Sequence, residues 1–177
     1  MQCIVMTDQL GAIASNGEQP IYLKADLLRF QSLTRNHAVI MGRRTFMCLP
    51  NMKPLGNREN YVLTTSPECL PGVGQYKNLH AYRSVQEILE HAPADAFIIG
   101  GGTIYRQFMF CCDTIYLTKV MTTFDHPTAF FPKISEDWVI DPKFDENEVE
   151  IDQDRFTSGI YQTKLIIYRR YRYARSK

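Results

Sequence analysis

Apolar residues of this chain occur in short runs that alternate with stretches of helical spacing. The runs at residues 3–7, 39–41, 61–65, 96–99 and 114–120 are typical of strands buried in a sheet. Between them, apolar residues recur every three or four positions, as on one face of a helix. This alternation predicts an α/β fold with a central, mostly parallel sheet and about four helices on its faces, in one domain spanning residues 1–177.

The second half of the chain adds weaker signals. Residues 138–140 and 161–168 are expected to pair as antiparallel strands, and Ser84 with Glu87 forms a capping box that begins a helix. Residues 12–19 are polar and predict a mobile loop, of the kind that can act as a lid. An acidic run without the glycine of a calcium loop is interpreted as a solvated face. Its members are Asp145, Glu146, Glu148, Glu150, Asp152 and Asp154.

The helical stretch after Pro20 carries one carboxylate beside its apolar face. Leu23, Leu27 and Phe30 are spaced by four and three residues, and Asp26 borders the face that they form. Burial there would raise the pKa of the carboxyl group, which makes such a group useful for proton transfer near neutral pH. The alternative is an exposed first-turn residue that the helix dipole stabilises.

Two turns between a strand and a helix are candidate phosphate sites. Residues 42–45 (Gly-Arg-Arg-Thr) follow one apolar run, and residues 100–102 (three glycines) follow another. Glycine lets backbone N–H groups approach a ligand closely, and arginine adds charge. A solvated basic turn and a simple tight turn are the alternatives. The triple glycine is not the dinucleotide fingerprint, because that motif requires its third glycine where Tyr105 stands.

The composition of the chain argues against several classes of protein, among them secreted, membrane-spanning and nucleic-acid-binding proteins. The chain has 177 residues, 45% of them hydrophobic, and a formal net charge of +1, which argues against a nucleic-acid footprint over the whole domain. Residues 1–6 are too short an apolar run for a signal peptide or a membrane span. Five cysteines without metal-ligand spacing predict reduced thiols in a cytosolic protein and no metal site; the adjacent pair at 111–112 is expected to pack at a helix end. The basic, aromatic residues 169–175 could stack on single-stranded nucleic acid, but an exposed strand end is the preferred interpretation.

In order and spacing, these motifs resemble the dihydrofolate reductase family. Residues 20–30 read Pro-x-x-Leu-x-x-Asp-Leu-x-x-Phe, and residues 39–46 read Val-Ile-Met-Gly-Arg-x-Thr-Phe. The match continues through Pro54-Leu55, Arg58 and residues 98–105 and 115–118, and covers the chain from residue 3 to about residue 138. The resemblance implies NADPH-dependent reduction of 7,8-dihydrofolate to tetrahydrofolate in one-carbon metabolism, by a cytoplasmic, monomeric enzyme that antifolates target.

The resemblance also implies roles for individual residues. Asp26 matches the carboxylate of the pterin pocket, Thr118 the threonine that supports it, and Arg58 the arginine that binds the glutamate of the substrate. The other implied substrate-binding residues are Ile4, Val5, Ile21, Phe30, Leu49, Leu55, Ile99 and Tyr105. The implied cofactor-binding residues are Met6, Ile13, Asn16, Gly17, Gly42, Arg43, Arg44, Thr45, Leu63, Thr64, Thr65, Arg83, Gly100, Gly101, Gly102, Thr103, Ile104, Tyr105 and Gln107. The cations among them favour NADPH over NADH.

The chain departs from the family pattern near the pterin. Ile21 stands where most members have tryptophan, Gln19 where an apolar residue is usual, and Gly56-Asn57 where Pro-Gly is usual. These departures leave turnover and antifolate sensitivity open. Two other functions therefore stay possible. One is reduction of another pterin, or of a pyrimidine intermediate in flavin synthesis, against which Asp26 argues; the other is folate or nucleotide binding with lost catalysis, which Ile21 suggests.

Overall fold

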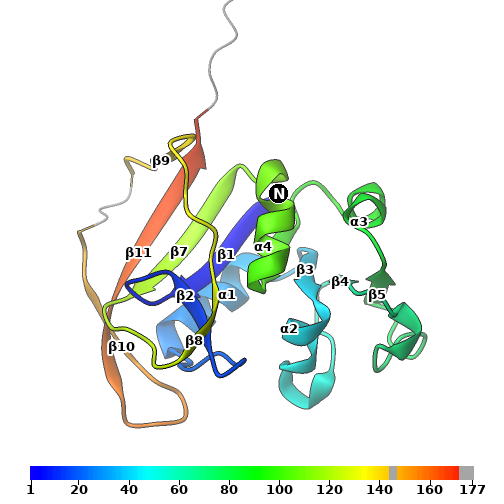
Figure 1. Cartoon of the computed structure of the whole chain (residues 1–177), viewed down its shortest axis with the longest axis horizontal. Coiled ribbons are helices and arrows are strands. Elements are labelled where there is room, and N and C mark those ends of the chain that lie inside the picture. Colours follow the sequence, from blue (N-terminus) through cyan, green and yellow to red (C-terminus); the bar gives the residue numbers. More distant parts are fainter. Residues whose placement is uncertain (144–146, 172–177) are drawn as a thin grey trace, which may run out of the picture.

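The molecule is built on one large sheet, as the computed structural model in Figure 1 shows for residues 1–143 and 147–171. Nine strands lie in the order β10-β11-β7-β1-β6-β3-β4-β5, with β9 also paired to β11. The strands are β1 (Gln2–Thr7), β3 (Val39–Gly42), β4 (Asn60–Leu63), β5 (Leu79–Tyr82), β6 (Phe97–Gly100), β7 (Thr114–Val120), β9 (Trp138–Ile140), β10 (Glu150–Gln153) and β11 (Ile160–Arg170). All pairs from β7 to β5 are parallel, and β11 pairs antiparallel with β7, β9 and β10. The predicted mostly parallel sheet with antiparallel C-terminal strands is confirmed.

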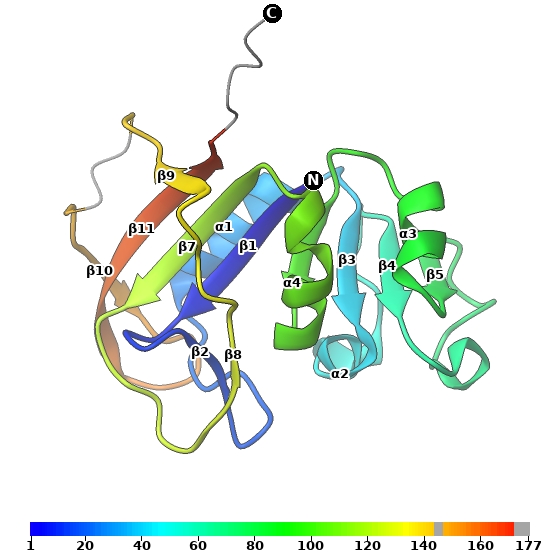
Figure 2. The same ribbon diagram turned by 45° about the horizontal axis from the view of Figure 1, so that its top comes forward.

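Four α-helices cover this sheet within the described residues. They are α1 (Lys24–Thr34), α2 (Arg43–Met47), α3 (Val85–His91) and α4 (Gly102–Phe108), with single 3₁₀ turns at η1 (Pro50–Met52), η2 (Pro67–Cys69) and η3 (Met109–Cys111). Figure 2 shows α1 behind β1 and β7, and α4 on the opposite face. The predicted cap before α3 forms, because the hydroxyl of Ser84 accepts from the N–H of Glu87 at 3.2 Å, while the carboxylate of Glu87 accepts from the N–H of Arg83 at 2.9 Å rather than from that of Ser84. None of the described helices has the length and apolar character to cross a membrane.

The core has two layers because side chains alternate across the strands. Ile4 packs on the face of α1 and α2, whereas its neighbour Val5 packs on the face of α3 and α4. In β3, Val39 and Met41 take the first face and Ile40 the second. The sheet is therefore covered on both sides, which explains why its central strands are continuous apolar runs.

The polar segment predicted as a mobile loop is in part a strand. Residues Ala12–Ser15 form β2, which pairs antiparallel with β8 (Pro127–Phe130) in a separate two-stranded sheet. The sequence shows no alternation of apolar and polar residues here, because the side chains of β8 are largely exposed and the register between β2 and β8 shifts twice. The remainder, residues 16–19, is the connection that leads to α1.

The acidic run before β11 is only in part the expected solvated face: Glu148 is exposed, but the last two aspartates are not. Asp152 and Asp154 are buried, with exposed fractions of 5% and 4%, and lie at or beside the edge strand β10. Asp154 accepts a hydrogen bond from the N–H of Tyr22 at 2.8 Å, so it fastens the chain just before α1. Asp145 and Glu146 lie outside the described residues.

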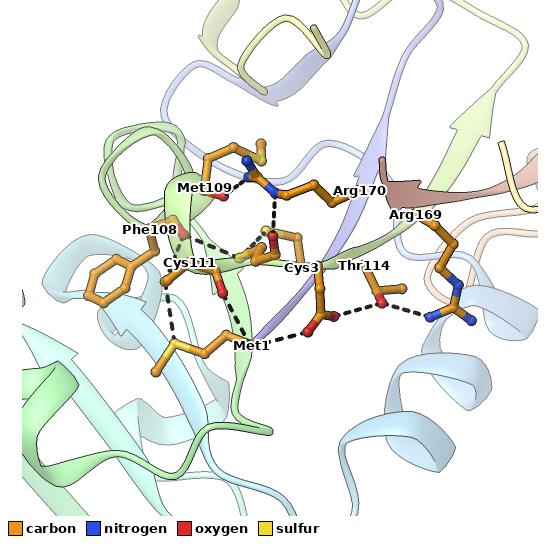
Figure 3. Close-up of polar contacts among 10 residues, drawn as sticks. Met1, Cys3, Phe108, Met109, Cys111, Thr114, Arg169 and Arg170 are labelled. Atoms are coloured by element: carbon orange, nitrogen blue, oxygen red, sulfur yellow. Dashed lines mark hydrogen bonds and ion pairs between the residues drawn. The ribbon is translucent and has the colours of Figure 1, made fainter. Parts of the chain in front are cut away.

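The end of β11 is fixed beside the start of β7 (Figure 3). Arg170 donates to the carbonyl oxygens of Met109 and Cys112 at 2.6 and 2.8 Å, and Arg169 donates to the hydroxyl of Thr114 at 2.7 Å. The first two cations of the basic tail thus have structural partners, and residues 172–175 lie outside the described part of the chain.

Two buried thiols pack in the same region. The sulfur atoms of Cys3 and Cys112 are 3.4 Å apart, and Cys112 is buried at the end of η3, as the helix-end interpretation requires. Burial and the neighbouring thiol raise the pKa of Cys112 above its usual range. Within the described residues the cysteines are free, and no cluster of three or more His, Cys, Asp or Glu is arranged to hold a metal ion.

Candidate active site

The first turn of α1 is closed by a carboxylate from the other end of the chain. The N-cap residue is Leu23, whose side chain has no hydrogen-bond acceptor. Asp152 takes this role: it accepts from the N–H of Ala25 with both oxygens at 3.0 Å and from the N–H of Asp26 at 3.2 Å. Unpaired N–H groups and the helix dipole both favour an anion at this position. Strand β10 therefore fixes the helix turn that carries Asp26.

The carboxyl group of Asp26 lies in a sheltered, charged environment. Burial raises its pKa, and the hydroxyl of Thr118 on β7 opposes that shift by donating a hydrogen bond to the carboxylate. The charge of Arg29 also lowers the pKa of Asp26, whereas Asp152 and Glu150 raise it. The structure thus brings Asp26 and Thr118 together. Asp26 does lie in the first turn of α1, as the alternative interpretation has it, but it is half-buried rather than exposed.

A second polar contact closes the opposite side of this region. The hydroxyl of Tyr105 on α4 donates to the carbonyl oxygen of Ile4 on β1 at 2.7 Å. Tyr105 is fully enclosed, and burial raises the pKa of its hydroxyl well above 10. The phenol therefore stays neutral, and the negative charge of Asp26 adds to the rise in its pKa.

Most residues predicted to form the substrate wall belong to one apolar cluster. Around the buried Ile4 lie the half-buried side chains of Phe30, Leu49, Leu55 and Ile99, which come from four separate segments. Half-buried apolar side chains that converge from several elements are typical of a ligand pocket.

Other predicted site residues lie in the remaining clusters. The side chain of Val5 packs in the cluster on the opposite face of the sheet. Ile21 is buried, with 6% of its side chain exposed, beside Leu23 and Phe124, and Met6 packs against that third cluster. Val5 therefore offers its backbone rather than its side chain to the face of Ile4, because alternate residues of a strand face opposite ways.

Arg58 is held at the far end of the apolar wall. Its guanidinium lies 5.8 Å from the ring centre of Phe30 and donates to the hydroxyl of Thr34 at 2.9 Å. Burial lowers the pKa of Arg58, but the guanidinium remains charged at neutral pH. The fully buried Asn60 fixes this loop, since its amide donates to the carbonyl oxygens of Leu55 and Arg58 at 3.0 and 2.8 Å.

The glycines after β3 and β6 meet at one edge of the sheet. A Cβ atom on Gly42 would lie 2.9 Å from the side chain of Ile104, and one on Gly102 would lie 2.8 Å from the carbonyl oxygen of Phe130. A Cβ on Gly101 would lie 3.6 Å from the hydroxyl of Thr45. Gly100 has a φ of +121°. A Cβ atom would clash at Gly42 and Gly102, and the φ of Gly100 favours glycine, whereas Gly101 has room for one. These contacts join the two predicted phosphate turns into one surface, with β8 beside it.

Several cations and hydroxyl groups surround this surface. Arg43 and Arg44 are exposed at the start of α2. Arg83 donates to the carbonyl oxygen of Thr65 at 2.8 Å and forms an exposed ion pair with Glu68. The other predicted cofactor residues of this edge are the buried Thr64, the half-buried Leu63 and the exposed Thr103 and Gln107.

The β2–β8 sheet places the remaining predicted cofactor residues. Asn16 has a φ of +49° and its N–H donates to the carbonyl of His126, while the N–H of Gly17 donates to the hydroxyl of Thr128 at 2.9 Å. Ile13 packs against the main core. Since β8 ends against Gly102, this sheet borders the glycine surface.

Four residues that shape the site were not found from the sequence: Arg29, Glu150, Asp152 and Asn60. The first three act through hydrogen bonds across more than 80 positions, for which no local pattern exists. Asn60 could have been found, because it is a polar residue directly before a buried apolar run. A buried amide at such a position needs hydrogen-bond partners, which its neighbours in the loop supply.

Known proteins resemble this chain over most of its length. A family model described as dihydrofolate reductase matches residues 1–163. A dihydrofolate reductase of Haemophilus influenzae is 33% identical over 158 residues, covering 86% of this chain and 91% of the relative. One of Bacillus subtilis is 29% identical over 137 residues, covering 76% and 71%. A solved dihydrofolate reductase from Enterococcus faecalis, complexed with NADP(H) and RAB-propyl, matches with a TM-score of 0.76 at 27% identity, covering 97% of this chain and 96% of that one. The chain therefore belongs to the dihydrofolate reductase family.

Proposed function

We propose that this oxidoreductase reduces 7,8-dihydrofolate to tetrahydrofolate, with Asp26 holding the pterin. The observation that carries the proposal is the environment of Asp26: one sheltered carboxylate, hydrogen-bonded by Thr118, beside the apolar cluster around Ile4. A pterin requires these two features together, because its ring is flat and apolar on its faces and carries an amino group and a ring N–H along one edge.

Asp26 favours the reaction by stabilising a protonated substrate. The carboxylate accepts hydrogen bonds from the 2-amino group and the N3 side of the pterin, and its charge promotes proton uptake by the ring. NADPH, when bound at the glycine surface, would supply the hydride for C6 of the pterin, whose N5 would gain a proton. The hydroxyl of Thr118 holds the carboxylate in one orientation. Arg58 closes the other end of the site as a fork for the carboxylate of the substrate's glutamate.

The glycine surface fits a dinucleotide phosphate. Gly42 and Gly102 leave backbone atoms uncovered where a Cβ atom would collide with a neighbour, and Gly101 lies between the two turns, close to the hydroxyl of Thr45. Arg43 and Arg44 are exposed at the same edge, so each is available to an extra ribose phosphate. This arrangement supports NADPH as the preferred cofactor. We also propose that the chain is a cytoplasmic monomer. Its main strands form one large sheet, as in a single domain, and its net charge of +1 is too small for a protein that binds nucleic acid over its whole surface.

The test is NADPH oxidation followed in single turnovers with 7,8-dihydrofolate. We expect the parent protein to oxidise NADPH only when dihydrofolate is present. Asp26→Asn keeps the shape of the side chain but removes its charge, and should lower the rate at pH 7 by about 10²–10⁴-fold. Asp137→Asn, at an exposed aspartate outside the site, is the matched control and should keep the parental rate.

Three results would contradict the proposal. A parent protein that binds dihydrofolate and NADPH without oxidising the cofactor would be a binding protein. Oxidation with a flavin-pathway pyrimidine and not with dihydrofolate would assign the chain to the other reductase class. Parental rates in Asp26→Asn would remove Asp26 from the mechanism.

A further inference from the structure

Arg29 connects the Asp26–Thr118 contact to the edge of the sheet. It lies one helical turn after Asp26, where side chains three residues apart are neighbours. One guanidinium nitrogen donates to the hydroxyl oxygen of Thr118 at 3.2 Å, and another donates to a carboxylate oxygen of Glu150 on β10 at 2.8 Å. Only 18% of the Arg29 side chain is exposed, compared with 39% for Glu150, so the cation lies deeper than its partner.

We propose that Arg29 and Glu150 form a charge pair that orients Thr118 and controls proton uptake at Asp26. Arg29 is thus a positioning residue, acting through Thr118 and Asp26 rather than on the substrate itself. The inference rests on the proposed function, since it concerns the carboxylate that holds the pterin.

The orienting role follows from what a hydroxyl group can do. Thr118 has one proton to donate and lone pairs to accept with. Arg29 occupies an acceptor position of the hydroxyl oxygen, and the proton of Thr118 is then directed to the carboxylate of Asp26. Loss of the guanidinium would free the hydroxyl to rotate.

The control of proton uptake follows from the charges that face Asp26. Arg29 is on α1, Glu150 and Asp152 are on β10, and Tyr105 on α4 is neutral. A proton taken up by the carboxyl group, or by a pterin that it holds, adds positive charge to this site. Arg29 disfavours that step and the two anions favour it. Removing Arg29 and removing Glu150 must therefore shift proton uptake in opposite directions.

The experiment compares pH profiles of the single-turnover rate with dihydrofolate. The rate should fall as pH rises through an apparent pKa. For Arg29→Met the apparent pKa should rise by about one unit. This is the lower end of the effect of a nearby opposite charge, because Glu150 already neutralises part of the charge of Arg29 in the parent. The variant should therefore react about tenfold faster than the parent on the alkaline side. For Glu150→Gln, which keeps a hydrogen-bond acceptor, the apparent pKa should fall by about half a unit.

Two controls separate charge from structure. Arg29→Lys keeps the charge and should leave the apparent pKa within about 0.3 unit of the parental value, while loosening the contact with Thr118. Glu59→Gln removes one partner of an exposed pair with His80, remote from Asp26 in the sheet order, and should leave the profile unchanged. A lower rate at every pH in Arg29→Met, with an unchanged apparent pKa, would show a merely structural role and overturn the proposal.

A second measurement does not depend on activity. The carboxyl carbon of Asp26 can be titrated by NMR in the unliganded protein, in the parent and in each variant. Opposite shifts for Arg29→Met and Glu150→Gln support the charge pair. Shifts in the same direction, or none, overturn it, and Glu150→Gln alone decides the sign if Arg29→Met does not fold. If the parent fails to reduce dihydrofolate, the proposed function fails, and the NMR titration still tests the role of Arg29.

Discussion

Replacing Asp152 with alanine should remove the N-terminal cap of α1 and lower the free energy of unfolding. The carboxylate accepts from the N–H groups of Ala25 and Asp26, at 3.0 and 3.2 Å, and is buried. Loss of a side-chain cap costs about 0.5–2 kcal/mol, and loss of an anion at a helix N-terminus costs about 0.3–1 kcal/mol more. Because the site is shielded from water, we expect the upper part of the sum, about 2–3 kcal/mol. For a domain of this size that lowers Tm by about 4–12 °C.

Urea unfolding followed by circular dichroism measures this loss directly. Asp152→Asn keeps one oxygen acceptor without the charge and should lose about half as much free energy of unfolding. Glu136→Ala, at an exposed acidic residue, is the control and should stay within about 0.5 kcal/mol of the parent. If Asp152→Ala also stays within that margin, the N–H groups of α1 find other partners, and β10 does not hold the helix.

Three further variants test the site. The double variant Arg43→Ala, Arg44→Ala removes two charge-assisted contacts of about 1.5–3 kcal/mol each, so the Kd for NADPH should rise by about 100-fold or more while that for NADH barely changes; equal Kd values for the two cofactors in the parent would refute this. Ile21→Trp should alter hydride transfer in stopped-flow traces and, because Ile21 is buried, cost about 1–3 kcal/mol in urea; identical binding and turnover would place Ile21 away from the pterin. Burial raises the pKa of Asp26 in the folded state, so the parent loses stability as pH rises from the unfolded value through the folded one. Asp26→Asn should therefore be more stable than the parent at pH 8, by a margin that narrows as the pH falls toward the unfolded pKa of the carboxyl group. A margin that widens on acidification would contradict the burial argument.

Strands with both faces covered were predictable, whereas the edge strand β10 was not, although β9 at residues 138–140 was expected. The run Val39–Gly42 is apolar throughout because helices pack on both sides of it, so the sequence alone shows its burial. Strand β10 reads Glu-Ile-Asp-Gln, with the apolar side chain of Ile151 exposed and the acidic side chain of Asp152 buried. Strand β10 pairs with β11 and is buried by α1. Its own four residues show neither contact, because both partners are distant in sequence.

The same division holds within the site. Asp26, Arg58 and the glycine turns belong to motifs whose residues are close in sequence, and these were found. The partners that set their chemistry are distant: Glu150 lies 121 positions from Arg29, and Asp152 lies 126 positions from Asp26. A glutamate and an aspartate in an acidic stretch look solvent-exposed until the tertiary structure shows which N–H groups and guanidinium they satisfy.

The cap on α1 also sets an order of events during synthesis. The helix that carries Asp26 receives its capping carboxylate from a residue made 126 positions later. At about 5–20 residues per second, Asp152 is synthesised some 6–25 s after Asp26. By the end of that interval the growing chain holds every glycine of the cofactor surface and the whole apolar wall, yet until Asp152 is added its pterin carboxylate lies on an uncapped helix end. Assembly of the pterin pocket is therefore a late event, completed by the last strands to leave the ribosome.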